Sequence, residues 1–221
     1  MASTDMLTPL TAGAGEGDVL VPNGGTARGW RCYDGRHGGT WVADIDRRAE
    51  GDAQDGKAVH MRTGNAVGRL TPQPRYHRSL VVRHRVDPAI DMSFRVERWD
   101  QAAAGAGVKV AVGHQDNLTN TFVMLNADGT VKVFKEARDG IDADRGPYGW
   151  TVATGSSSWI PKPGVRHHLH IDVTDGGRTL DVTLDGDRLL HADDITPPIP
   201  AGQIGFRLDG VDLTIHSLVI S

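Results

Sequence analysis

Short segments of alternating apolar and polar residues fill the C-terminal part of the chain. Between Trp159 and Ser221, four such segments are separated by turn residues. Alternation with a period of two is typical of a β-strand that buries one face, and turn residues at short intervals favour antiparallel pairing. The run therefore predicts an antiparallel β-sheet.

Similar segments precede this run, at residues 79–86, 90–99, 108–114, 121–125 and 130–135. Asn126–Gly129 (N-A-D-G) joins the last two as a hairpin turn, in which Gly129 can adopt a positive φ. The 28 glycines suit many tight turns, and no segment with helical periodicity exceeds two turns. Ten or more short strands without helices predict an all-β fold of two packed antiparallel sheets, a β-sandwich of the jelly-roll type.

The domain organisation follows from length and composition. A chain of 221 residues can form one such sandwich. Residues 1–26 are small, polar and glycine-rich, so we expect a flexible N-terminal arm followed by a single domain over residues 27–221. A single cysteine, Cys32, excludes an intrachain disulfide and is expected to be structural.

Net charge and hydropathy limit the expected binding partners and cellular location of the protein. A net charge of -4 gives no reason to expect binding to nucleic acid or to an anionic membrane. The N-terminus lacks the basic and apolar regions of a signal peptide, and no stretch approaches the length of a membrane span. We therefore expect a soluble, cytoplasmic protein.

The period of two also assigns side chains to faces. One face of the segment after Val165 is apolar, whereas Arg166, His168 and His170 lie on the other. His84 is in phase with core residues, which predicts a buried, hydrogen-bonded histidine, and His114, at the end of its segment, is in phase with the core valines. The predicted outer polar face of the other strands carries Arg83, Arg85, Arg95, Glu97, Trp99, Lys109 and Arg207.

The closing segments show a family resemblance. W-x-P-x-P-G-x-x-H-x-L-x-I-D-V-x-D-G, then L-D-V-x-L-D-G, then A-G-Q-I-G-F-R-L-D-G-V-D-L-T-I-H-S-L-V-I resemble the last strands of concanavalin A-like lectin/glucanase jelly rolls. The pattern is similar in particular to laminin-G-like domains and to the 3-keto-disaccharide hydrolase group, and it spans roughly residues 28–221. The resemblance implies a jelly roll and a carbohydrate ligand.

The resemblance implies no catalytic residues. Concanavalin A-like proteins include lectins, carbohydrate-binding modules, glycoside hydrolases and polysaccharide lyases, and a fold does not fix an activity. The E-x-D-x-x-E strand of the laminarinase-like hydrolases is absent from this sequence, as are the R-x-E-x-R and Q-x-H strands of the alginate lyase group.

Three functions remain open. The first is a module that holds a sugar or another polyhydroxylated ligand on its concave sheet. Tyr148 and Trp150, in the long segment 140–158, either stack on that ligand or cover a sheet edge. The predicted ligand-binding residues are Arg83, Arg85, Arg95, Trp99, Lys109, Tyr148, Trp150 and Arg207.

The second function is a glycoside hydrolase or lyase that uses the same face, with His168, His170 and Glu97 as the catalytic candidates. Hydrolysis needs two carboxylates across the scissile bond. A lyase needs a base, such as His, and a cation to neutralise a uronate. The third function is a structural or partner-binding sandwich, in which the outward histidines are solvated.

No cofactor is predicted with a defined site. His168 and His170 could share a metal ion, but the sequence does not identify a third ligand. Calcium is an open alternative, because acidic segments occur at Asp139–Asp144 and at Asp193–Asp194. Neither segment matches a defined calcium loop, and both can be solvated turns.

Overall fold

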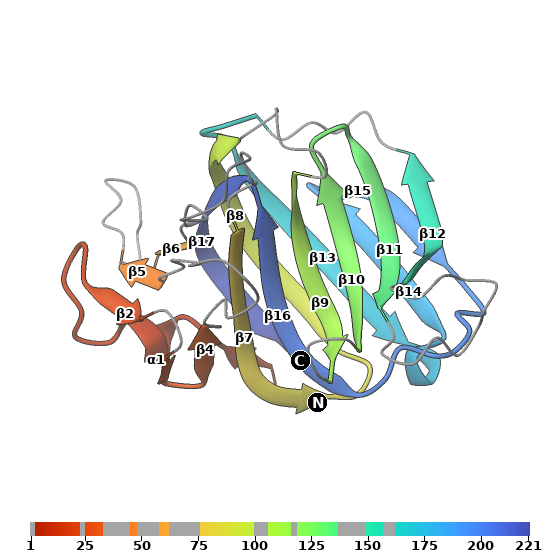
Figure 1. Ribbon diagram of the computed structural model, residues 1–221, viewed down its shortest axis with the longest axis horizontal. Helices are drawn as coiled ribbons and strands as arrows, with labels where there is room; N and C mark the ends of the chain where they lie inside the picture. The colour runs from red at the N-terminus through yellow and green to blue at the C-terminus, as the bar shows by residue number, and fades with distance from the viewer. Residues whose placement is uncertain are drawn as a thin grey trace, which may run out of the picture.

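Two antiparallel β-sheets packed face to face form the protein in the computed structural model (Figure 1). The structure describes residues 3–22, 25–32, 45–47, 58–61, 76–99, 106–115, 119–136, 149–156 and 162–221, without the side chains of 45–47, 76–80, 82–84 and 156. Helical turns in these ranges are limited to α1 (Thr8–Thr11) and η1 (Asp175–Gly177). The predicted all-β sandwich is confirmed.

The strands divide between the two layers. The nine-stranded sheet has the order β15 (Asp187–Ala192), β14 (Thr179–Leu184), β13 (Arg166–Thr174), β8 (Ala89–Trp99), β17 (Val211–Ile220), β6 (Val59–Met61), β5 (Ile45–Arg47) and β2 (Val19–Val21), with β1 (Thr4–Asp5) paired to β17. The eight-stranded sheet has the order β12 (Trp150–Ser156), β11 (Thr130–Glu136), β10 (Asn120–Asn126), β9 (Gly107–His114), β16 (Gly202–Asp209), β7 (Tyr76–Arg85), β4 (Trp30–Cys32) and β3 (Thr26–Ala27). Consecutive strands β16 and β17 therefore belong to different sheets.

The core lies between the sheets and follows the alternation in the sequence. Ile90, Met92 and Phe94 of β8 are fully buried, and so are Val108 and Val110 of β9 on the facing sheet. Burying one such side chain stabilises the fold by about 1.5–3 kcal/mol. Hydrophobic burial on the inner faces thus holds the two layers together.

The first residues pack against the sandwich, although their composition predicts a flexible arm. Met6 and Leu7, just before α1, and Leu10 within it are buried. The indole Nε1 of Trp30 donates a hydrogen bond to the carbonyl oxygen of Met6 at 3.1 Å. Arg28 donates to three carbonyl oxygens around the end of α1, those of Pro9, Leu10 and Ala12. The division of the chain at residue 26 stays a prediction.

Two bulges change the faces that strict alternation predicts. In β8, Val96 lies opposite Leu213 but Trp99 lies opposite Val211, so β8 has one extra residue there. Trp99 consequently packs against the core, and its predicted place on the outer face is wrong. In β9, a register shift against β16 lies between Ala111 and His114 and takes His114 out of phase with the core valines.

The segment between β15 and β16, residues 193–201, covers one end of the core. Ile195 and Ile199 are buried. The backbone N–H of Ile199 donates to the carbonyl oxygen of Gly177 at 2.8 Å, and the Lys135 ammonium contacts the carbonyl oxygen of Pro197. This segment leads directly into β16. None of the described helices is long or apolar enough to cross a membrane.

Candidate functional site

Strands β16, β9, β10 and β11 lie side by side in the eight-stranded sheet (Figure 1). Three rows of side chains cross the outer face of these strands. Residues directly opposite one another on paired strands share a face. The cationic row contains Arg207, Lys109, Met124 and Lys132, and the apolar row contains Gly205, Ala111, Phe122 and Phe134. The amide row contains Gln203, His114, Asn120 and Glu136. The apolar row lies between the other two.

A chain of polar contacts connects the outer rows. The amide Nδ2 of Asn120 donates to Glu136 Oε2 at 3.0 Å. Arg207 places its Nη1 3.5 Å from Glu136 Oε1, and its Nε donates to Asp209 Oδ1 at 3.1 Å. The ammonium of Lys109 contacts the other oxygen of Asp209. Two carboxylates thus hold one guanidinium across the face.

The contact between Arg207 and Glu136 indicates a curved sheet. These residues lie on β16 and β11, with β9 and β10 between them. Strands about 4.8 Å apart would place β16 and β11 roughly 14 Å apart in a flat sheet. A contact across that span requires both side chains to lie along the face and the sheet to curve toward it.

Burial distinguishes this face from an ordinary solvated one. The side chains of Lys109 and Asp209 are 10% and 5% exposed. Phe122 is only 6% exposed, although it lies on an outer face. Burial lowers the pKa of Lys109, and the neighbouring carboxylate of Asp209 opposes that shift. The ammonium is therefore held in a partly desolvated site.

The hydrogen bonds of Asn120 define the orientation of His114. A carboxylate only accepts hydrogen bonds, so the amide nitrogen of Asn120 must be the group that faces Glu136. Its Oδ1 then faces Nδ1 of His114, which it contacts. Nδ1 of His114 must therefore carry the proton. The bulge in β9 makes this contact available, so the predicted phase of His114 with the core valines is wrong, although its side chain is buried.

The predicted catalytic histidines lie on the opposite surface of the sandwich, on the outer face of the nine-stranded sheet. His170 Nδ1 is 2.8 Å from Asp91 Oδ1, and His168 Nε2 is 3.9 Å from the same oxygen. The side chains of His168, His170 and Asp91 are 58%, 36% and 46% exposed. The structure thus brings both histidines to one carboxylate, in a solvated setting.

Arg95 and Glu97 form a second group on that same face. Arg95 donates to Glu97 Oε1 through Nε at 3.0 Å and through Nη2 at 2.8 Å. The hydroxyl of Thr214 donates to the same oxygen at 2.5 Å. Because Lys109 and Arg207 lie on the other sheet, the predicted polar residues form two separate surfaces and not one concave site.

The remaining predicted ligand-binding residues join neither group. Arg85 lies near the end of β7, with its Nη2 3.5 Å from the hydroxyl of Thr4. Trp150 lies opposite Lys135, whose ammonium contacts the segment 193–201 at the end of the core. Tyr148 and the side chain of Arg83 lie outside the described residues.

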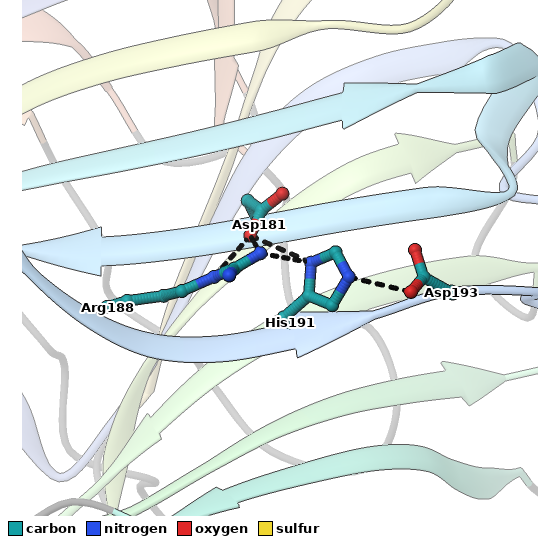
Figure 2. Close-up of polar contacts among 4 residues, drawn as sticks. All are labelled: Asp181, Arg188, His191 and Asp193. Carbon is teal, nitrogen blue, oxygen red and sulfur yellow. Dashed lines mark hydrogen bonds and ion pairs between the residues drawn. The ribbon is translucent and has the colours of Figure 1, made fainter.

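A third polar cluster lies at the edge of the nine-stranded sheet, on β14 and β15 and just after β15 (Figure 2). His191 contacts Asp181 Oδ1 through Nδ1 at 2.9 Å and Asp193 Oδ2 through Nε2 at 2.7 Å. Arg188 Nε donates to Asp181 Oδ1 at 2.7 Å. These side chains are 34–60% exposed, so the cluster is in contact with water. Its contacts connect the edge strand β15 to the neighbouring strand β14.

The cluster predicts a pH dependence. Hydrogen bonds to Asp181 and Asp193 raise the pKa of His191 above its ordinary value of 6.5. The bonds stabilise the folded state fully below the unfolded pKa, and this stabilisation is lost as the pH rises through the folded pKa. We expect the imidazole signal of His191 in an NMR titration to have its midpoint above 6.5. Asp193→Asn should lower that midpoint, and an unchanged midpoint would contradict the assignment.

Sequence reasoning missed Asn120, Glu136 and Asp209. The signal was present for the two carboxylates, because Glu136 is in phase with Lys132 and Asp209 with Arg207. The contacts between them depend on the order of strands, which local alternation does not contain. Among the described residues, no group of three His, Cys, Asp or Glu side chains is arranged to hold a metal ion. Residues 139–144, one of the two calcium candidates, lie outside the described ranges.

The fold and the site define an antiparallel β-sandwich with a buried polar network on one outer face. No family model matches the sequence, and no curated protein matches it. The protein is similar in structure to the carbohydrate-binding module CBM66 from Bacillus subtilis, with a TM-score of 0.53, 14% identity and coverage of 85% of this chain and 91% of that one.

Two further solved structures share the fold. The metal-free carbohydrate recognition domain of Emp46p has a TM-score of 0.52 and 11% identity, with coverage of 81% of this chain and 87% of that one. A protein described as a native glycosidic hydrolase has a TM-score of 0.56 and 9% identity, with coverage of 94% and 96%. At these identities the comparisons establish the sandwich fold.

Proposed function

We propose that the outer face of the eight-stranded sheet binds a carbohydrate. The observation that carries the proposal is the apolar row between two polar rows joined by Arg207 and Glu136. A pyranose has C–H groups that pack on an aromatic ring and hydroxyls around its edge that need hydrogen-bond partners. Phe134, which is partly exposed, supplies the aromatic surface, and the flanking polar side chains supply the donors and acceptors.

Comparison of the two outer faces favours this position. The network on the eight-stranded sheet has side chains that are 5–24% exposed. On the nine-stranded sheet Arg95 and Glu97 are similarly buried, at 25% and 18%, but Asp91, His168 and His170 are 36–58% exposed. A hydrogen bond to a ligand stabilises the complex more where water has less access to the site. The proposed carbohydrate site therefore contains the predicted residues Lys109 and Arg207, together with Asn120, Glu136 and Asp209.

The similar structures are consistent with the proposal, since their names describe a carbohydrate-binding module, a carbohydrate recognition domain and a glycosidic hydrolase. The finer assignment, to the concanavalin A-like group and its laminin-G-like or 3-keto-disaccharide hydrolase members, stays a prediction from the closing sequence segments.

Arg207→Ala should weaken glycan binding about 10- to 100-fold, because hydrogen bonds from a charged group are worth about 1.5–3 kcal/mol. The measurement is binding to a panel of neutral and acidic oligosaccharides, followed by calorimetry on those that bind. His170→Ala is the matched control on the opposite face and should bind normally. A protein that binds no member of the panel, or that loses binding equally in both variants, would refute the proposal.

Turnover of the glycan is a second candidate function. The observation that favours it is that two carboxylates, Glu136 and Asp209, contact the same guanidinium on this face. Hydrolysis by the usual glycosidase route uses a pair of carboxylates. Mass spectrometry of the same panel after incubation separates the candidates: products that disappear in Glu136→Gln indicate an enzyme, and bound but intact glycans indicate a binding module.

A further inference from the structure

The charges on the outer face of the eight-stranded sheet differ in sign from those of the whole chain. The outward positions of β9, β10, β11 and β16 carry three cations, Lys109, Lys132 and Arg207, and two carboxylates, Glu136 and Asp209. The chain as a whole has a net charge of -4. The face is therefore locally positive, and all three cations lie in one row.

The three cations differ in how their charge is balanced. Lys109 is buried and paired with Asp209, so its charge is satisfied within the protein. Lys132 is partly buried and interacts with the exposed carboxylate of Asp128, in the preceding turn, through its charge alone; within the described part of the chain no carboxylate forms an ion pair or a hydrogen bond with it. An anionic group of a ligand would balance this charge without displacing an internal partner.

Arg207 can reach the same anion. Its Nε is held by Asp209 at 3.1 Å, whereas its Nη1 contact with Glu136 is longer, at 3.5 Å. With Nε held by Asp209, the outer edge of the planar guanidinium, Nη1 and Nη2, carries two parallel N–H groups that fit a carboxylate in place of the longer contact with Glu136.

We propose that the ligand of this face is an acidic glycan whose uronate carboxylate lies beside Lys132 and Arg207, with the sugar ring against the partly exposed Phe134. This inference rests on the proposed carbohydrate site and specifies its ligand class. The hydroxyls on the other edge of the ring face Asn120 and Glu136. The arrangement distinguishes a uronate from a neutral sugar because the cations lie on one side of the ring only.

The experiment compares oligogalacturonate and oligoalginate with the same oligomers after reduction of their carboxyl groups to alcohols. We expect at least one acidic oligomer to bind about tenfold more tightly than its reduced form, and to bind more weakly at 200 mM than at 50 mM salt. Lys132→Met should remove that preference without lowering thermal stability. Lys162→Met, at an exposed lysine outside this face, makes the same charge change and should retain the preference.

The outcomes separate this inference from the proposed site. Equal or tighter binding of the reduced oligomers overturns the acidic ligand, and the carbohydrate site still stands if Arg207→Ala abolishes that binding. An equal loss in Lys132→Met and Lys162→Met also overturns it, because the effect would then be one of net charge. Absence of binding to every oligomer, acidic or reduced, counts against both.

Discussion

Replacement of Asp209 by alanine is expected to lower the free energy of unfolding by about 3–5 kcal/mol, because it leaves a buried cation without its carboxylate. The side chain of Lys109 is 10% exposed and its ammonium contacts Asp209, and Arg207 shares that carboxylate. The measurement is equilibrium denaturation of the variant and the unmodified protein. The double replacement Lys109→Met, Asp209→Asn removes the charge together with its partner and should recover most of the loss.

A matched control lies on the other sheet. Asp181 also forms an ion pair, with Arg188, but these side chains are 34% and 55% exposed. Exposed pairs contribute about 0–1 kcal/mol, so Asp181→Ala should change stability little. Equal losses at Asp209 and Asp181 would mean that Lys109 stays solvated and that the network on the eight-stranded sheet is not desolvated.

Gly177→Ala is expected to destabilise the protein by about 3–5 kcal/mol, from backbone strain and overpacking together. Gly177 has a φ of +82°, and a Cβ there would lie 2.2 Å from the carbonyl oxygen of Ile199. The hydrogen bond from Ile199 N–H to Gly177 holds the segment 193–201 over the end of the core. Thermal unfolding should show a lower midpoint, and limited proteolysis should show early cleavage in this segment.

The neighbouring glycine separates strain from contact. Gly176 has a φ of +62°, and a Cβ there would meet nothing within 4 Å. Gly176→Ala should therefore lower the free energy of unfolding through backbone strain alone, by about 1–2 kcal/mol. If both variants lost the same stability, the close approach of Ile199 to Gly177 would have no energetic role.

The fold was predictable because the alternation of apolar and polar residues is visible within each strand. Leu169, Ile171 and Val173 alternate with polar residues, and all three are buried in the core. Bulges break that rule. Trp99 and His114 each lie beyond an extra residue in a strand, and one extra residue moves a side chain to the other face of the sheet. The local sequence of either strand contains no signal that predicts the bulge.

The candidate site was predictable in residue type but not in arrangement. Alternation places Arg207, Lys109 and Glu97 on outer faces, and it contains no information about which sheet each strand joins. The pairing of β16 with β9, and of β8 with β17, assigns them to opposite surfaces. Contacts such as Arg207 with Glu136 arise only from strand order and sheet curvature, both of which are properties of the assembled sheets.

The position of the last two strands has a consequence for the order of folding. β16 lies between β9 and β7 in one layer, and β17 lies between β8 and β6 in the other. Their partners precede them by about 90 to 150 residues, from Gln203 opposite His114 to Leu213 opposite Met61. During synthesis neither layer can be completed before residues 202–220 have left the ribosome. Until then, strands β7, β8 and β9 have exposed edges, and protection of those edges from aggregation depends on β16 and β17.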